Sequence, residues 1–129
     1  MADYSFHLLN VFAEKPRSGD PLLVFDVAEM PTAEIRQALA YQMGHAESVF
    51  LNRTTLELRV HSPQFELPYS GRAALGAACV LTHADAIFST ATFHFAEHNI
   101  SVQYIDGSYV FISLAGSTRP CERGILEVA

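Results

Sequence analysis

The sequence is poor in positive charge. It has one lysine, Lys15, and seven arginines scattered along the chain, and its formal net charge is −6. Because a protein that binds nucleic acid phosphates needs a basic face, this balance argues against a nucleic-acid partner. No basic amphipathic helix is visible either, so we expect no binding to a membrane surface.

Long apolar runs are also lacking, and the first residues show no leader pattern. No stretch reaches the ~18–20 apolar residues that span a bilayer. Residues 1–4 are not a positive region followed by an apolar run, so we expect no signal peptide. The two cysteines, Cys79 and Cys121, do not suggest a disulfide framework. We therefore expect a cytoplasmic protein without a membrane-spanning segment.

The apolar content is high enough for a sizeable core. Half of the residues are hydrophobic, 17% are charged, and the length suits one domain over residues 1–129. No internal repeat or low-complexity segment is present. Residues 115–129 contain glycine and proline without a clear period, so we expect them to form a tail.

Hydrophobic periodicity predicts seven strands and two helices. The strands are expected at residues 4–12, 22–27, 47–52, 55–61, 92–95, 100–105 and 109–114. Asp106-Gly107 predicts a tight hairpin between the last two strands. The first helix has Thr32 and Gly44 as its expected caps. Its expected apolar stripe is Ile35, Ala38, Leu39 and Met43.

The second helix, residues 73–81, is apolar on nearly every side and must therefore be surrounded by protein. The polar turn before it, Ser70-Gly71-Arg72, leaves backbone N–H groups and a guanidinium at the helix N-terminus. That combination binds small anions. The pattern predicts an α+β fold in which a mostly antiparallel, barrel-like sheet wraps around this central helix, with one further helix outside.

Three segments resemble motifs of the phenazine-biosynthesis isomerase (PhzF-like) family, which shares its fold with the diaminopimelate epimerases. Asn10-Val11-Phe12 followed by Ser18-Gly19-Asp20-Pro21 is similar to the family's opening strand and G-N-P turn. Ala46-Glu47-Ser48-Val49-Phe50 is similar to its S-E-T-x-F segment. Residues 59–76 are similar to its R-x-F-T-P-x-x-E-L-P-x-x-G-H-P/A-T-L-G run.

This resemblance implies a two-halved architecture. Members of the family are typically longer, with two similar halves and an active site in the cleft between them, and this chain resembles the first half. A symmetric homodimer would then bring two copies face to face and rebuild the cleft. The family's histidine after the glycine is Arg72 here. Because arginine can only donate hydrogen bonds, this change favours binding over acid–base exchange.

The resemblance also implies site residues. Glu47 aligns with the family's catalytic glutamate. Burial among apolar neighbours such as Val49 and Phe50 would favour its protonated form and suit it to carry a proton between two carbons. Ser70, Gly71 and Arg72 would hold a substrate carboxylate. The simpler alternatives are a solvent-facing glutamate, a helix-capping serine and a surface arginine.

Three further residues are weaker candidates. Asp20 replaces the family's asparagine and could approach the ligand, or it could be only a turn residue. His45 could share the face of Glu47 in an extended chain. Either His45 or His61 could replace the missing histidine, although an ordinary polar histidine is the simpler interpretation.

We therefore predict a cofactor-independent isomerase or epimerase that moves a proton on a small carboxylated metabolite in natural-product biosynthesis. The alternative is a non-catalytic protein that binds a small carboxylate or natural product with the same fold. His94 and His98 lie around a turn, with no carboxylate or cysteine cluster nearby, so we expect no metal site.

Overall fold

The computed structural model describes residues 4–11, 20–83, 90–105, 108–113, 122–124 and 126–128, with side chains described for 4–9, 21–81 and 90–103. Two helices and ten strands lie in these ranges. In chain order they are β1 (Ser5–Val11), β2 (Asp20–Val27), α1 (Ala33–Met43), β3 (Ser48–Asn52), β4 (Leu58–His61), β5 (Glu66–Leu67), α2 (Gly71–His83), β6 (Thr90–His94), β7 (Asn99–Ile105), β8 (Ser108–Ser113), β9 (Glu122–Gly124) and β10 (Leu126–Val128).

The strands form two sheets. One has six strands in the order β10-β1-β2-β3-β4-β5, and the other has four in the order β6-β7-β8-β9. The β2–β3 pair is parallel, and the other pairs in both sheets are antiparallel. A bridge between Glu57 and His94 joins the sheets. The predicted α+β class is confirmed, but the described strands form two sheets and no closed barrel.

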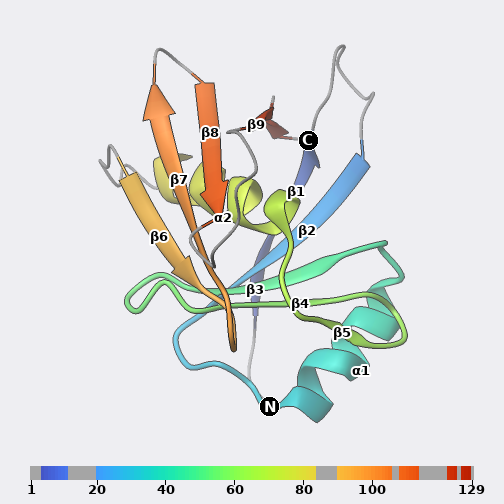
Figure 1. Cartoon of the computed structure of the whole chain (residues 1–129). Coiled ribbons are helices and arrows are strands. Elements are labelled where there is room, and N and C mark those ends of the chain that lie inside the picture. The colour runs from blue at the N-terminus through green and yellow to red at the C-terminus, as the bar shows by residue number, and fades with distance from the viewer. Residues whose placement is uncertain are drawn as a thin grey trace.

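Helix α2 lies between the strands of the two sheets, as Figure 1 shows. Every residue from Ala73 to Leu81 is buried, which confirms the predicted central helix. Its many small residues allow the strands to approach closely. A Cβ on Gly76 would overlap Leu22 Cδ2 and lie 3.4 Å from Leu9 Cδ1, so a larger residue where α2 crosses β1 and β2 would force the Leu22 side chain to move.

The six-stranded sheet is covered on both faces. Because side chains alternate along a strand, Val49 and Leu51 face α2, whereas Phe50 faces the side covered by α1. Phe50 stacks on Phe25 there, with ring centroids 4.8 Å apart. The centre of this sheet is therefore dry on both sides.

The caps of α1 are confirmed. The Thr32 hydroxyl accepts a hydrogen bond from the Ile35 amide at 3.3 Å, and Gly44 ends the helix with a positive φ of 73°. The predicted apolar stripe is wrong, because α1 buries Arg36 and Ala40 instead. Of the stripe, Ile35, Ala38 and Met43 are exposed and Leu39 is half-buried. Arg36 can be buried because its guanidinium finds acceptors beneath the helix.

Three short strands lie where we expected a loop or tail. β5 falls within the predicted loop before α2, and β9 and β10 fall within residues 115–129. Strands this short have too few residues to show a period in sequence. The predicted hairpin agrees with the pairing of Ile105 with Ser108, although Asp106 and Gly107 lie outside the described residues.

Two features are absent from the described part of the chain. No helix there is long and apolar enough to cross a membrane. No group of three or more His, Cys, Asp or Glu side chains there is arranged to hold a metal ion.

Candidate functional site

Glu47 lies directly before β3, at the edge of the core. Its side chain is only 9% exposed, and its backbone carbonyl accepts from the Leu23 amide of β2 at 3.4 Å. It falls on the same face of the sheet as Val49, towards α2, while Phe50 faces away. The sequence left open whether Glu47 is buried or faces solvent. The structure buries it, and polar groups of the α2 N-terminus contact its oxygens.

Ser70 caps α2 and also holds Glu47. Its hydroxyl oxygen accepts from the Ala73 amide at 3.2 Å, and its carbonyl accepts from the Ala74 amide at 3.2 Å. The same hydroxyl donates to Glu47 Oε1 at 2.6 Å. Because the hydroxyl oxygen accepts a hydrogen bond from a helix amide, the hydroxyl proton is left to donate to the Glu47 carboxylate. The capping alternative for Ser70 is therefore confirmed, and the same hydroxyl also contacts Glu47.

Arg72, on the first turn of α2, pairs with the other oxygen of the same carboxylate. Its Nε donates to Glu47 Oε2 at 2.8 Å, and its Nη2 contacts the same oxygen. The side chain is 27% exposed, three times as much as that of Glu47. Two donors of one guanidinium thus converge on a single carboxylate oxygen, and both contacts are charge-assisted.

These contacts give the N-terminus of α2 an anion from within the chain. Helix N-termini favour negative charge because their first amides lack acceptors within the helix. Here that charge is the Glu47 carboxylate, held by Ser70 and Arg72. The amide of Gly71 finds no acceptor among the residues that the structure describes. The arrangement suits recognition of a carboxylate and proton exchange at Glu47.

The predicted site residues divide into two groups. Glu47, Ser70 and Arg72 come together, with Gly71 between the last two. Their roles stay predictions. His45 is half-buried, and within the described side chains it makes no hydrogen bond to these three. Asp20 begins β2 and pairs with Val11, but its side chain lies outside the described part of the chain.

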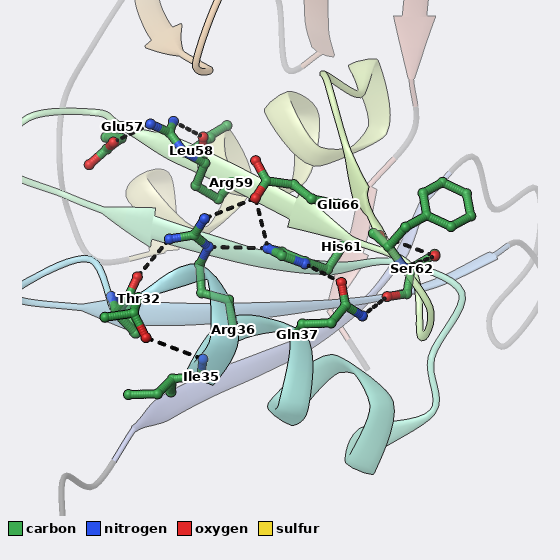
Figure 2. A network of polar contacts seen from close by, with 12 residues as sticks. Thr32, Ile35, Arg36, Gln37, Glu57, Leu58, Arg59, His61, Ser62 and Glu66 are labelled. Carbon is green, nitrogen blue, oxygen red and sulfur yellow. Dashed lines mark hydrogen bonds and ion pairs between the residues drawn. The ribbon is translucent and has the colours of Figure 1, made fainter.

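His61 lies on the opposite face of the six-stranded sheet, beneath α1 (Figure 2). Its Nε2 accepts from Arg36 Nε at 3.1 Å, which leaves the proton of the neutral ring on Nδ1. That nitrogen donates to Gln37 Oε1 at 2.8 Å, and Gln37 Nε2 donates to the Ser62 carbonyl at 2.9 Å. The network therefore requires one neutral tautomer.

The charge state of His61 follows from this environment. Burial lowers the pKa of His61, the nearby Glu66 carboxylate raises it, and the Arg36 guanidinium lowers it, with a net decrease from 6.5. His61 is 1% exposed. Because it is neutral, buried and separated from Glu47 by the sheet, it is not placed to replace the family's acid–base histidine.

The sequence analysis missed the Arg36–Glu66 pair. Arg36 Nη2 donates to Glu66 Oε1 at 2.9 Å, and Arg36 Nη1 donates to the Pro31 carbonyl at 2.6 Å. This pair joins α1 to β5, because Arg36 lies on the helix and Glu66 on the strand (Figure 2). Glu66 lies four residues before Ser70 in the chain. The sequence held one signal that Arg36 could be buried. Arg36 lies four residues before Ala40, so both fall on the same face of α1, and both are buried.

Comparisons with known proteins agree on one family. The family model described as phenazine biosynthesis-like protein matches residues 9–103. An uncharacterised isomerase of Pasteurella multocida is 41% identical over 86 residues, which are 63% of this chain and 30% of that protein. A trans-2,3-dihydro-3-hydroxyanthranilate isomerase of Pseudomonas fluorescens is 33% identical over 88 residues, which are 64% of this chain and 31% of that protein. The chain thus spans less than half the length of these curated relatives.

Solved structures show the same fold. A PhzF family protein of Enterococcus faecalis superposes with a TM-score of 0.76 at 23% identity, over 83% of this chain and 42% of that chain. A predicted epimerase of Pseudomonas aeruginosa superposes with a TM-score of 0.66 at 27% identity, over 84% of this chain and 42% of that chain.

Proposed function

This chain belongs to the phenazine biosynthesis-like protein family, and we propose that its Glu47 site forms one wall of an isomerase or epimerase active site. The observation that carries the proposal is the buried Glu47 carboxylate, held at the N-terminus of α2 by Ser70 and Arg72. A carboxylate excluded from water and fixed by hydrogen bonds is suited to move a proton at carbon without a cofactor.

The proposed reaction is a proton transfer between two carbons. Glu47 takes a proton from one carbon while the C–H electron pair stays in the substrate's conjugated system. The protonated Glu47 then returns the proton to a second carbon, or to the same carbon from the other face. Ser70, Gly71 and Arg72 bind the substrate carboxylate, and their positive potential stabilises the electron-rich intermediate.

The relatives and the site support one class of substrate. One relative is named trans-2,3-dihydro-3-hydroxyanthranilate isomerase, and the compound in that name has a carboxylate on a six-membered ring. A guanidinium and a free helix amide recognise such a carboxylate. We propose a small cyclic or amino-acid-derived carboxylate from natural-product biosynthesis as the substrate.

The site also needs a facing wall, because Arg72 and Ser70 are partly open to solvent. For the polypeptide of 129 residues, we propose that a symmetric homodimer supplies it. Mass measurement in solution, by light scattering, tests this part separately. A strict monomer at the concentrations that support turnover would leave the dimeric site without support.

Solvent isotope exchange tests the proposed chemistry. Trans-2,3-dihydro-3-hydroxyanthranilate is incubated with the protein in D₂O, and deuterium in the product is measured by mass spectrometry. We expect incorporation that Glu47→Gln abolishes. Glu57→Gln is the matched control, because Glu57 is also paired with an arginine, at 2.7 Å, but lies away from α2's N-terminus. Equal incorporation by wild type and Glu47→Gln would remove Glu47 from the mechanism.

The second candidate is a non-catalytic protein that binds a small carboxylate or natural product. The observation that favours it is the Arg72–Glu47 pair, because a permanently charged arginine keeps the glutamate engaged and cannot itself exchange protons near neutral pH. Carboxylate binding without any deuterium incorporation would support this candidate over the enzyme.

A further inference from the structure

Arg72 is already engaged by Glu47 in the proposed site. It donates from Nε and Nη2 to Glu47 Oε2, and the proposed function also assigns it to the substrate carboxylate. These two donors form one edge of the guanidinium, and a substrate carboxylate that takes this edge must displace Glu47 from it. The two carboxylates then compete for that edge.

We propose that Glu47 is an internal competitor, which a bound carboxylate displaces from Arg72 and thereby frees to accept a proton. This inference rests on the proposed function in taking a carboxylate as the ligand. The exchange replaces one carboxylate partner of this guanidinium edge by another, so the edge keeps a charged partner.

The exposures of the two side chains support this order of events. Arg72 is 27% exposed and Glu47 is 9% exposed. A ligand arriving from solvent therefore meets the guanidinium before it meets the buried carboxylate. Its charge is attracted by Arg72 and by the α2 N-terminus, both of which favour an anion.

The hydrogen bonds of Glu47 explain why displacement would matter for chemistry. A carboxylate has about four acceptor positions, and three donated hydrogen bonds from Ser70 Oγ, Arg72 Nε and Arg72 Nη2 lie on this one. When Arg72 leaves, Oε2 regains its lone pairs and can face the substrate carbon. Proton abstraction then depends on a substrate that carries a carboxylate.

Ser70 keeps Glu47 in place during the exchange. Its hydroxyl is fixed by the Ala73 amide of α2 and donates to Oε1, not to Oε2. The glutamate thus retains one short hydrogen bond of 2.6 Å while the other oxygen is released. Ser70 is the fixed contact of the carboxylate, and Arg72 is the exchangeable one.

Benzoate binding, measured by titration calorimetry, tests the competition without requiring turnover. We expect Glu47→Gln to bind benzoate about tenfold tighter than wild type or more, because it removes a competitor held by charge-assisted hydrogen bonds. Glu57→Gln, which loses the same charge beside Arg59, should change the affinity by less than about twofold. Benzamide, which has no charge, should show no such gain. An equal or weaker affinity in Glu47→Gln overturns the proposal.

A double-mutant cycle separates competition from simple charge repulsion. If Glu47 competes for Arg72, the gain from Glu47→Gln must disappear in an Arg72→Gln background. A gain that persists there means that Glu47 only repels the anion, and the proposal is wrong. Should Glu47→Gln fail to fold by circular dichroism, the NMR signal of the Arg72 Nε–H group serves instead. Saturating benzoate must shift that signal in the wild-type protein, and an unshifted signal contradicts the exchange.

These outcomes are independent of the proposed catalysis. If no deuterium is incorporated but Glu47→Gln still tightens benzoate binding, the isomerase function fails and the internal competition stands. If deuterium is incorporated but benzoate affinity is unchanged by Glu47→Gln, the function stands and the competition fails.

Discussion

Arg72 Nε and Nη2 both lie against the same carboxylate oxygen of Glu47, Oε2, although the two residues are 25 positions apart in the chain. The pair connects the start of β3 with the first turn of α2. It places a charged group of the sheet and a charged group of the central helix at one point on the edge of the core. The function proposed for this protein depends on that contact.

Removing the Ser70 hydroxyl should affect both stability and the site. Ser70→Ala loses the cap on the Ala73 amide and one donor to Glu47. We expect unfolding free energy to fall by about 1–2 kcal/mol, as for other helix caps, together with a loss of isotope exchange. Thr32→Ala is the matched control, because Thr32 caps α1 through the Ile35 amide. It should cost similar stability and leave exchange intact. Equal effects of both on exchange would make Ser70 purely structural.

Adding a methyl group at Gly76 should weaken the contact between α2 and the six-stranded sheet. The new Cβ would overlap Leu22 Cδ2, so the buried Leu22 side chain would have to move. We expect Gly76→Ala to cost about 1–3 kcal/mol by urea unfolding, despite the better helix propensity of alanine. In a Leu22→Ala background the same change should cost much less. Strictly additive costs would show that Leu22 is not the obstacle.

Stability should depend on pH through His61. Its pKa is lowered in the folded protein, so below the ordinary value of 6.5 the unfolded chain binds a proton more readily than the folded one. The contribution of neutral His61 is therefore complete above that value and is lost as the pH falls towards the lowered pKa. We expect the stability difference between wild type and His61→Gln to shrink as the pH falls below the ordinary pKa of 6.5. Equal slopes for wild type and His61→Gln would contradict the assignment.

Truncating Arg36 should be far more damaging than truncating an arginine whose ion pair is more open to solvent. Arg36→Met leaves the Pro31 carbonyl and His61 Nε2 without their donor and Glu66 without its partner. We expect a loss of about 3 kcal/mol, as for other broken buried pairs. Arg53 is the control, because its pair with Asp26 is more open, at 36% and 23% exposure. Arg53→Met should cost less than about 1 kcal/mol, and similar losses would refute the structural role of Arg36.

Local patterns in the sequence anticipated much of this protein. Alternating strands, the Thr32 and Gly44 caps and the all-apolar helix depend on residues close together in the chain. The direction in which α1 faces was not predictable in this way. The apolar stripe predicted that Ile35 and Met43 would be buried. Arg36 is buried instead, because β4 and β5 supply acceptors for its guanidinium. A prediction based only on the spacing of apolar side chains cannot include hydrogen bonds from distant strands that satisfy a buried arginine.

The candidate site shows the same division. The sequence by itself determined that α2 is buried, because its residues are apolar on nearly every side, but it left open whether Ser70 only caps the helix and whether Glu47 faces solvent. Only the tertiary structure decided that Glu47 would lie at the N-terminus of α2, and that His61 would lie on the face of the sheet opposite to Glu47. Both outcomes depend on strand register and on the crossing of α2 over the sheet, which bring together groups that no local spacing relates.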